Sequence, residues 1–97
     1  MDADELPART KKFALYVIKL VSALRKTVPG RIIPNQIVRS GTSVAANYRS
    51  ACRAHSRSKF IAKIGIVLEE TDETLLWLKL VITRLEQFCR RSRTRKE

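Results

Sequence analysis

Apolar side chains recur every three or four positions along three stretches of this 97-residue chain, which is the spacing of one face of an α-helix. The pattern predicts helices over residues 10–28, with Thr10 as the N-cap, 34–53 and 58–84. Breaks at residues 28–30 and 54–58 separate them, each rich in residues that end or begin helices. Short breaks between helices favour an all-α, antiparallel up-and-down bundle.

The chain has room for one domain, and its apolar pattern sets the limits of that domain. We assign residues 1–9 to an N-terminal extension, residues 10–89 to the helical bundle and residues 90–97 to a basic C-terminal tail. The tail has no apolar period, so we expect it to be frayed or disordered. Only fifteen residues follow position 82, which leaves a fourth helix short or missing.

The third predicted helix is apolar on nearly every side over residues 75–82. Several neighbours enclose a helix of this kind. We therefore expect four of its residues to lie in the core or against partner chains: Trp77, Leu78, Val81 and Ile82. A chain of this length buries only about 60–65% of its unfolded surface, so we predict a homo-oligomer.

Basic residues dominate the middle of the chain. Lys and Arg number 20 against nine Asp and Glu, a net charge of +11, and residues 31–60 hold six basic and no acidic groups. This excess indicates an anionic partner, RNA or DNA, with RNA favoured. The candidate contacts surround the second break and are Arg49, Arg53, Arg57, Lys59 and Lys63, with Arg31 and the arginine tail as extensions.

The alternative for these residues is a solvated face that only keeps the protein soluble. If they bind nucleic acid, guanidinium groups suit phosphate because they form paired hydrogen bonds. Aromatic residues make up 6% of the chain and mostly belong to apolar stripes, so base stacking is not expected. Recognition should depend on the backbone and its shape.

The second predicted helix has two faces on a helical wheel. Arg39, Arg49 and Arg53 lie on one face. Gly41 costs about 1 kcal/mol relative to Ala inside a helix. Its presence indicates either the close approach of another backbone or a glycine that is merely tolerated. The opposite face points to the core and carries Ile37, Val44, Tyr48 and Ala51.

One stretch of the sequence is similar to a known family. The run QxxRSGTSVAANYR at residues 36–49, followed by KFIAK at 59–63 and by Trp77-Leu78, resembles bacterial four-helix-bundle proteins encoded by intervening sequences in 23S rRNA genes. These proteins are related to the accessory protein of diversity-generating retroelements. The resemblance covers about residues 10–82. Where the family often has acidic residues this chain has Ser50 and Lys59, which makes the second break more basic.

The resemblance implies a homo-oligomer of antiparallel bundles, generally a pentamer, and its retroelement members bind a reverse transcriptase and nucleic acid through basic surfaces. It also implies a polar contact between the second and third helices, with an ion pair from Arg39 to Glu70 or Glu73. Such a pair would remove Arg39 from the surface that faces RNA. The polar set carried over by position is Gln36, Arg39, Ser43 and Asn47 with Glu70 and Glu73. Offsets of 3, 7 and 11 keep the first four on one stripe.

Catalysis fits the sequence poorly. The sole histidine, His55, lies in a break, and no second titratable group is spaced to form an acid–base or nucleophilic pair with it. Glu69, Asp72 and Glu73 share a helical face, but carboxylates along one helix seldom enclose a cation. No glycine-rich phosphate loop occurs. We therefore expect no enzyme activity, cofactor, metal or small-molecule substrate.

The two cysteines, Cys52 and Cys89, stand alone and make no zinc motif. We expect them to be reduced and buried. The N-terminus is acidic, unlike a signal peptide, and no apolar run approaches the roughly 20 residues that span a bilayer. The sequence therefore predicts a cytoplasmic protein without a membrane role.

Two functions remain open. The first is a non-enzymatic, oligomeric bundle that binds structured nucleic acid electrostatically through the second break and the tail. The second is a protein-interaction scaffold that docks a partner enzyme, such as a reverse transcriptase, on the surplus apolar surface over residues 77–85.

Overall fold

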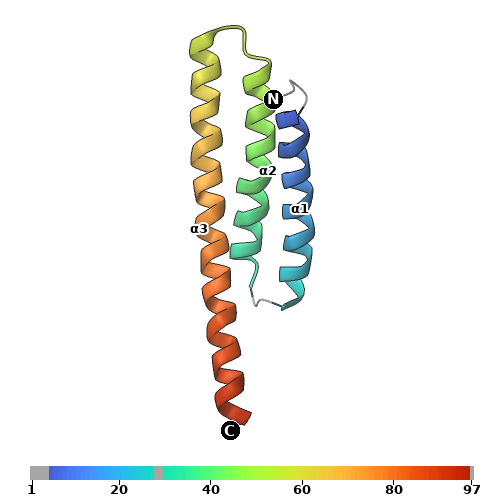
Figure 1. The fold of residues 1–97 in the computed structure, drawn as a ribbon, viewed down its shortest axis with the longest axis vertical. Coiled ribbons are helices and arrows are strands. Elements are labelled where there is room, and N and C mark those ends of the chain that lie inside the picture. The colour runs from blue at the N-terminus through green and yellow to red at the C-terminus, as the bar shows by residue number, and fades with distance from the viewer. Residues whose placement is uncertain (1–4, 28–29, 97) are drawn as a thin grey trace.

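The protein folds as three antiparallel helices with α2 between the other two (Figure 1). The computed structural model describes residues 5–27 and 30–96. The helices are α1 (Glu5–Thr27), α2 (Ile32–Cys52) and α3 (Arg57–Lys96), and these ranges contain no strand. The predicted all-α, up-and-down bundle is therefore confirmed.

Helix α1 begins at Glu5, five residues before the predicted N-cap. Thr10 lies inside the helix, where its hydroxyl donates to the carbonyl of Pro7 at 3.0 Å. An ion pair from Arg9 to Glu5, 2.6 Å long and one turn apart, stabilises the first turns. Part of the expected N-terminal extension is therefore helical.

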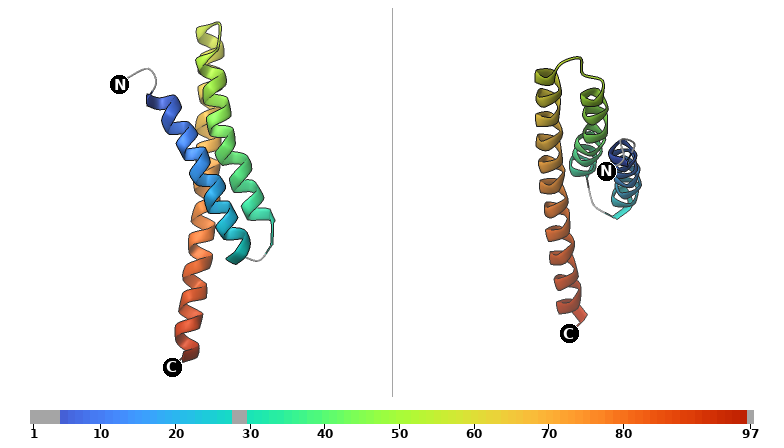
Figure 2. Two further views of the ribbon diagram at one scale, coloured as in Figure 1. Left: turned by 90° about the vertical axis from the view of Figure 1, so that its right-hand side faces the viewer. Right: turned by 45° about the horizontal axis from the view of Figure 1, so that its top comes forward.

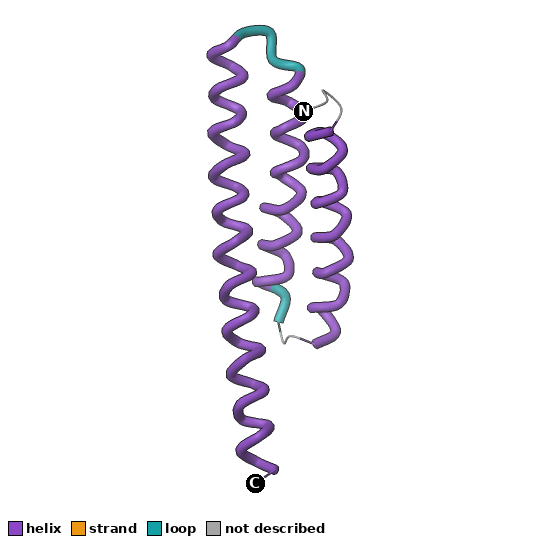
Figure 3. Tube along the Cα trace, viewed as in Figure 1, coloured by secondary structure: helices purple, strands orange, loops and turns teal. Residues whose placement is uncertain are grey.

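The two breaks lie close to their predicted positions (Figure 3). Val28 and Pro29 of the first break lie outside the described residues, and Gly30 after them has a φ of +87°, which favours glycine. At the second break, the hydroxyl of Ser56 accepts a hydrogen bond from the backbone N–H of Lys59 at 3.2 Å. Ser56 is therefore the serine that caps α3.

Helix α3 continues without a break for 40 residues, so the predicted end near Arg84 and the expected disordered tail are wrong. Residues 85–96 contain no glycine or proline and are rich in good helix formers. Once the packed part of α3 is formed, each further residue adds one hydrogen bond without a new nucleation cost. Among the described residues there is no fourth helix, and the C-terminal part of α3 extends beyond α1 and α2 (Figure 2).

One buried cluster joins the three helices. In addition to this apolar cluster, a buried hydrogen bond of 2.8 Å links the hydroxyls of Ser40 on α2 and Thr74 on α3. The cluster is formed by Val17, Val21, Leu24, Ile37 and Val81. The predicted core face of α2 is confirmed, since Ile37, Val44 and Ala51 are buried, while Tyr48 is half-buried.

The apolar segment of α3 is enclosed less than expected within one chain. Val81 is buried, and Trp77 and Leu78 are half-buried against the core, but Ile82 is 55% exposed. Leu20 of α1 is 39% exposed. Each outer helix packs mainly against α2, so a large part of its apolar surface has no neighbour in the single chain.

None of the described helices carries an apolar stretch that could span a bilayer.

Candidate nucleic-acid interface

Five basic residues flank the loop between α2 and α3. Arg53 caps the C-terminus of α2, its N–H bonded to the carbonyl of Ser50 at 3.2 Å, and Arg57 begins α3. All five side chains reach the surface, four of them exposed and that of Lys63 half-buried. We call this set the basic turn: Arg49, Arg53, Arg57, Lys59 and Lys63.

A polar cluster midway along α2 and α3 contains Arg39. Its guanidinium forms ion pairs with Glu70, at 3.3 Å, and with Glu73, and it donates to Gln36 at 3.1 Å. The Trp77 indole N–H donates to Glu73 at 3.4 Å. The charge of Arg39 is thus balanced by two carboxylates, and the predicted pair removes it from the free cations. We call Gln36, Arg39, Glu70 and Glu73 the Arg39 cluster.

These contacts shift two pKa values. The hydrogen bond from Arg39 is the main cause that lowers the pKa of Glu73, against a smaller effect of desolvation. The same bond raises the pKa of Arg39. The other two members of the predicted polar set bond to each other within α2, because the Asn47 amide donates to the carbonyl and hydroxyl oxygens of Ser43 at 2.9 and 2.8 Å.

The substitution Arg39→Gln should raise the pKa of Glu73 toward the ordinary glutamate value of about 4.3. Because the folded-state pKa of Glu73 is lowered, its pairing stabilises the fold above the unfolded pKa and is lost as the pH falls through the folded pKa. Carbon-13 NMR titration of the side-chain carboxyl measures the shift. An unchanged Glu73 titration in R39Q, or an equal change in the remote control R84Q, would contradict this assignment.

The antiparallel register extends from the Arg39 cluster to the basic turn. Starting from the Arg39–Glu73 pair, the residues ten positions nearer the loop are Arg49 on α2 and Lys63 on α3. Four residues further on lie Arg53 and Lys59. Acidic residues balance the positive charge at the cluster, whereas residues 40–52 of α2 and 57–68 of α3, which lie nearer the loop, include none. Positive charge therefore accumulates toward the basic turn.

The structure does not bring the two proposed extensions to this surface. Arg31 is the N-cap of α2, at the opposite end of a 21-residue helix about 30 Å long. Residues 90–96 lie at the far end of α3 (Figure 1). Arg31 and the arginine tail are therefore separate from the basic turn.

His55 is exposed in the loop, and no three His, Cys, Asp or Glu side chains among the described residues could together hold a metal ion.

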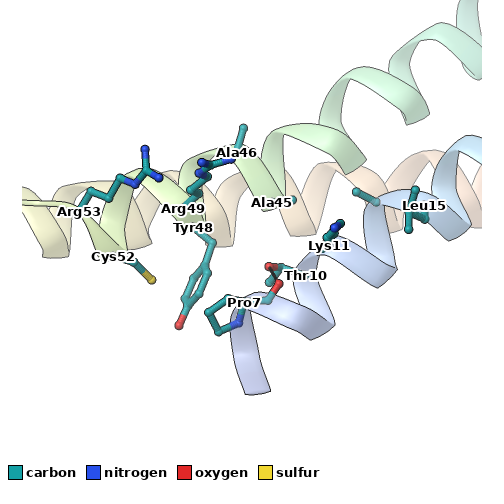
Figure 4. Close-up of a pocket in the computed structure, with 11 residues that line it drawn as sticks. Pro7, Thr10, Lys11, Leu15, Ala45, Ala46, Tyr48, Arg49, Cys52 and Arg53 are labelled. Carbon is teal, nitrogen blue, oxygen red and sulfur yellow. Dashed lines mark hydrogen bonds between the residues drawn. The ribbon is translucent and has the colours of Figure 1, made fainter. Parts of the chain in front are cut away.

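A cavity of about 510 Å³ lies beside the basic turn, between the start of α1 and the end of α2 (Figure 4). Tyr48, assigned to the core from the sequence, forms part of its wall, and Cys52, expected to be buried, is exposed there. Cys89 is exposed as well. Desolvation, and then the neighbouring Cys52, raise the pKa of the Tyr48 phenol. Small residues beside Tyr48, namely Ala45 and Ala46, were the sequence signal for an open space here.

An antiparallel helical bundle with a cationic loop at one end defines a class of small, basic, all-α proteins. The profile described as 23S rRNA-intervening sequence protein matches residues 5–88, and the chain belongs to this family. A crystal structure of a protein of unknown function from the S23 ribosomal protein family of Bacteroides thetaiotaomicron is 38% identical, with a TM-score of 0.77. The similarity covers 80% of this chain and 72% of that one. Comparison with curated proteins gave no match.

Proposed function

We propose that this protein is a non-enzymatic, cytoplasmic RNA-binding bundle that holds structured RNA through the basic turn. The observation that carries the proposal is the accumulation of exposed cations at one end of the molecule, where residues 40–68 include no acidic residue. Arginine forks match phosphate oxygens, and lysines add point charges. The family description, which names an rRNA intervening sequence, supports RNA as the polyanion.

Self-association belongs to the same proposal. Large apolar side chains outside the cavity are exposed on α1 and α3, including Ile18, Leu68, Leu76 and Phe88. A second copy of the chain would cover such surface, and the family resemblance points to a pentamer. Each added copy brings another basic turn, which raises avidity for a long polyanion without a new kind of contact.

Salt dependence tests the RNA contact. We expect the logarithm of the association constant for a structured RNA to fall linearly with the logarithm of salt concentration, by about 0.7–0.9 for each phosphate neutralised. Four or five contacts from one basic turn therefore give a slope near −3 to −4 for each copy engaged. Filter binding at several salt concentrations measures this slope. A flat slope, or no binding at low salt, would rule the function out.

A second function is favoured by one observation. The C-terminal half of α3 exposes Leu80, Ile82, Leu85 and Phe88. This surface could dock a partner enzyme, such as a reverse transcriptase, in place of another copy. Light scattering separates the two functions, because the scaffold predicts a monomer that needs a second polypeptide, whereas the RNA-binding bundle predicts a homo-oligomer.

A further inference from the structure

The cavity beside the basic turn combines three kinds of surface (Figure 4). Its apolar lining comes from Pro7, Ala14, Leu15, Ala45 and Ala46. Tyr48 supplies an aromatic ring that is only half-buried, and Lys11, Arg49 and Arg53 supply positive charge. Among the described residues that line the cavity, none is acidic. Glu5, in the first turn of α1, is paired with Arg9.

This combination selects one class of ligand. A purely apolar occupant, such as the face of a helix, would cover three cations without offering them a partner, and desolvating an unpaired charge is costly. A free phosphate would leave the ring and the apolar lining unused. A nucleotide satisfies both, since its base has an apolar face that stacks on aromatic rings and its phosphates carry negative charge.

Size and position support the same ligand. A cavity of about 510 Å³ is within the range of small-molecule and cofactor sites. Arg49 and Arg53 belong both to the cavity and to the basic turn, so one RNA strand that follows the cations passes the opening. Proteins read single-stranded loops and bulges of RNA by stacking bases that are already unpaired.

We propose that the cavity binds one unpaired nucleotide of an RNA loop or bulge, with its base against the ring of Tyr48 and its phosphates held by Arg49, Arg53 and Lys11. The proposal depends on the RNA-binding function and adds a contact with a base to it. It replaces the expectation that this protein recognises only the RNA backbone. Tyr48 is the residue that gives the cavity its preference for a base.

The first experiment compares two single-stranded oligomers of equal charge, an octauridylate and an eight-unit ribose-phosphate oligomer without bases. The wild type should bind the octauridylate about 5- to 150-fold more tightly, the range for stacking one base on one aromatic side chain. Tyr48→Leu should remove that difference and leave the affinity for the baseless oligomer unchanged. Tyr48→Phe should keep most of the difference.

Tyr16→Leu is the matched control, because Tyr16 is 60% exposed on α1 and does not line the cavity. It should leave both affinities unchanged. Equal binding of the two oligomers by the wild type would overturn the nucleotide site while leaving the RNA-binding function standing. Absence of salt-dependent binding to either oligomer would instead overturn the function itself.

A second experiment does not require a substitution at Tyr48. Cys52 lines the cavity, whereas the other exposed thiol, Cys89, lies near the far end of α3. In a Cys89→Ser variant, octauridylate should slow alkylation of Cys52 in proportion to the fraction of protein bound. In a Cys52→Ser variant, Cys89 should react at an unchanged rate. If Cys52 is unreactive without RNA, another copy or partner fills the cavity and the proposal is wrong.

Discussion

Gly41→Ala is expected to lower the free energy of unfolding by about 1–2 kcal/mol, although alanine is the better helix former by about 1 kcal/mol. A Cβ on Gly41 would lie 2.7 and 2.9 Å from the two Cγ atoms of Val17 on α1. Val17 is only 4% exposed and β-branched, so it cannot turn away. Overpacking therefore outweighs the gain in helix propensity.

Gly65→Ala is the matched control for this prediction. A Cβ on Gly65 of α3 would meet no atom within 4 Å, so here the gain in helix propensity should stand alone. The expected result is a rise in the free energy of unfolding of about 0.5–1 kcal/mol. Urea denaturation followed by circular dichroism measures both variants. If both stabilise the fold, α1 does not approach α2 at Gly41.

Because the contact joins Gly41 to one residue, Val17, a double-mutant cycle can test it. Val17→Ala removes both Cγ atoms and costs stability by itself, because Val17 belongs to the core. In that background Gly41→Ala should cost less than it does in the wild type, since the clashing atoms are gone. Additive effects of the two substitutions would show that the loss in the single variant has another cause.

Local features of the sequence predicted much of the fold. The apolar period located three helices, and the predicted break at residues 54–58 contains Ser56, which caps α3. The start of α1 and the end of α3 were not predicted. A helix extends from a part that is already packed against a neighbour, and the local sequence does not show where that packing is. The family resemblance implied the pair of Arg39 with a carboxylate, and the spacing of the polar residues along α2 agreed with it.

Features that depend on how two helices meet could not be predicted in the same way. The sequence left the role of Gly41 open, because only the register of α1 against α2 places Val17 over it. The cavity has the same origin, since residues near 7–15 and 45–53 come together only after folding. Tyr48 fits the core stripe by spacing, but in the folded chain it is half-buried and lines the cavity. The basic turn was found from charge alone because its members flank one short loop.

Neutralising the basic turn should have the largest effect on RNA binding. Four phosphate contacts at about 1 kcal/mol each correspond to a loss of affinity of roughly 10²- to 10³-fold at low salt. The salt slope should become shallower by about 3, since four phosphates are no longer neutralised. The variant that tests this carries Arg49→Gln, Arg53→Gln, Lys59→Gln and Lys63→Gln, which lowers the net charge from +11 to +7.

A second variant with the same net charge separates the site from the overall charge. It neutralises four exposed cations on the remaining surface of α1 and α3: Lys19, Lys26, Lys79 and Arg84. Long-range attraction is screened beyond about 10 Å at 0.1 M salt, so this variant should keep nearly all of the affinity and of the salt slope. If both variants lose affinity equally, RNA responds to net charge and the basic turn is not the site. The basic turn is the RNA-binding site only if its variant loses RNA affinity and the control variant, which has the same net charge, does not.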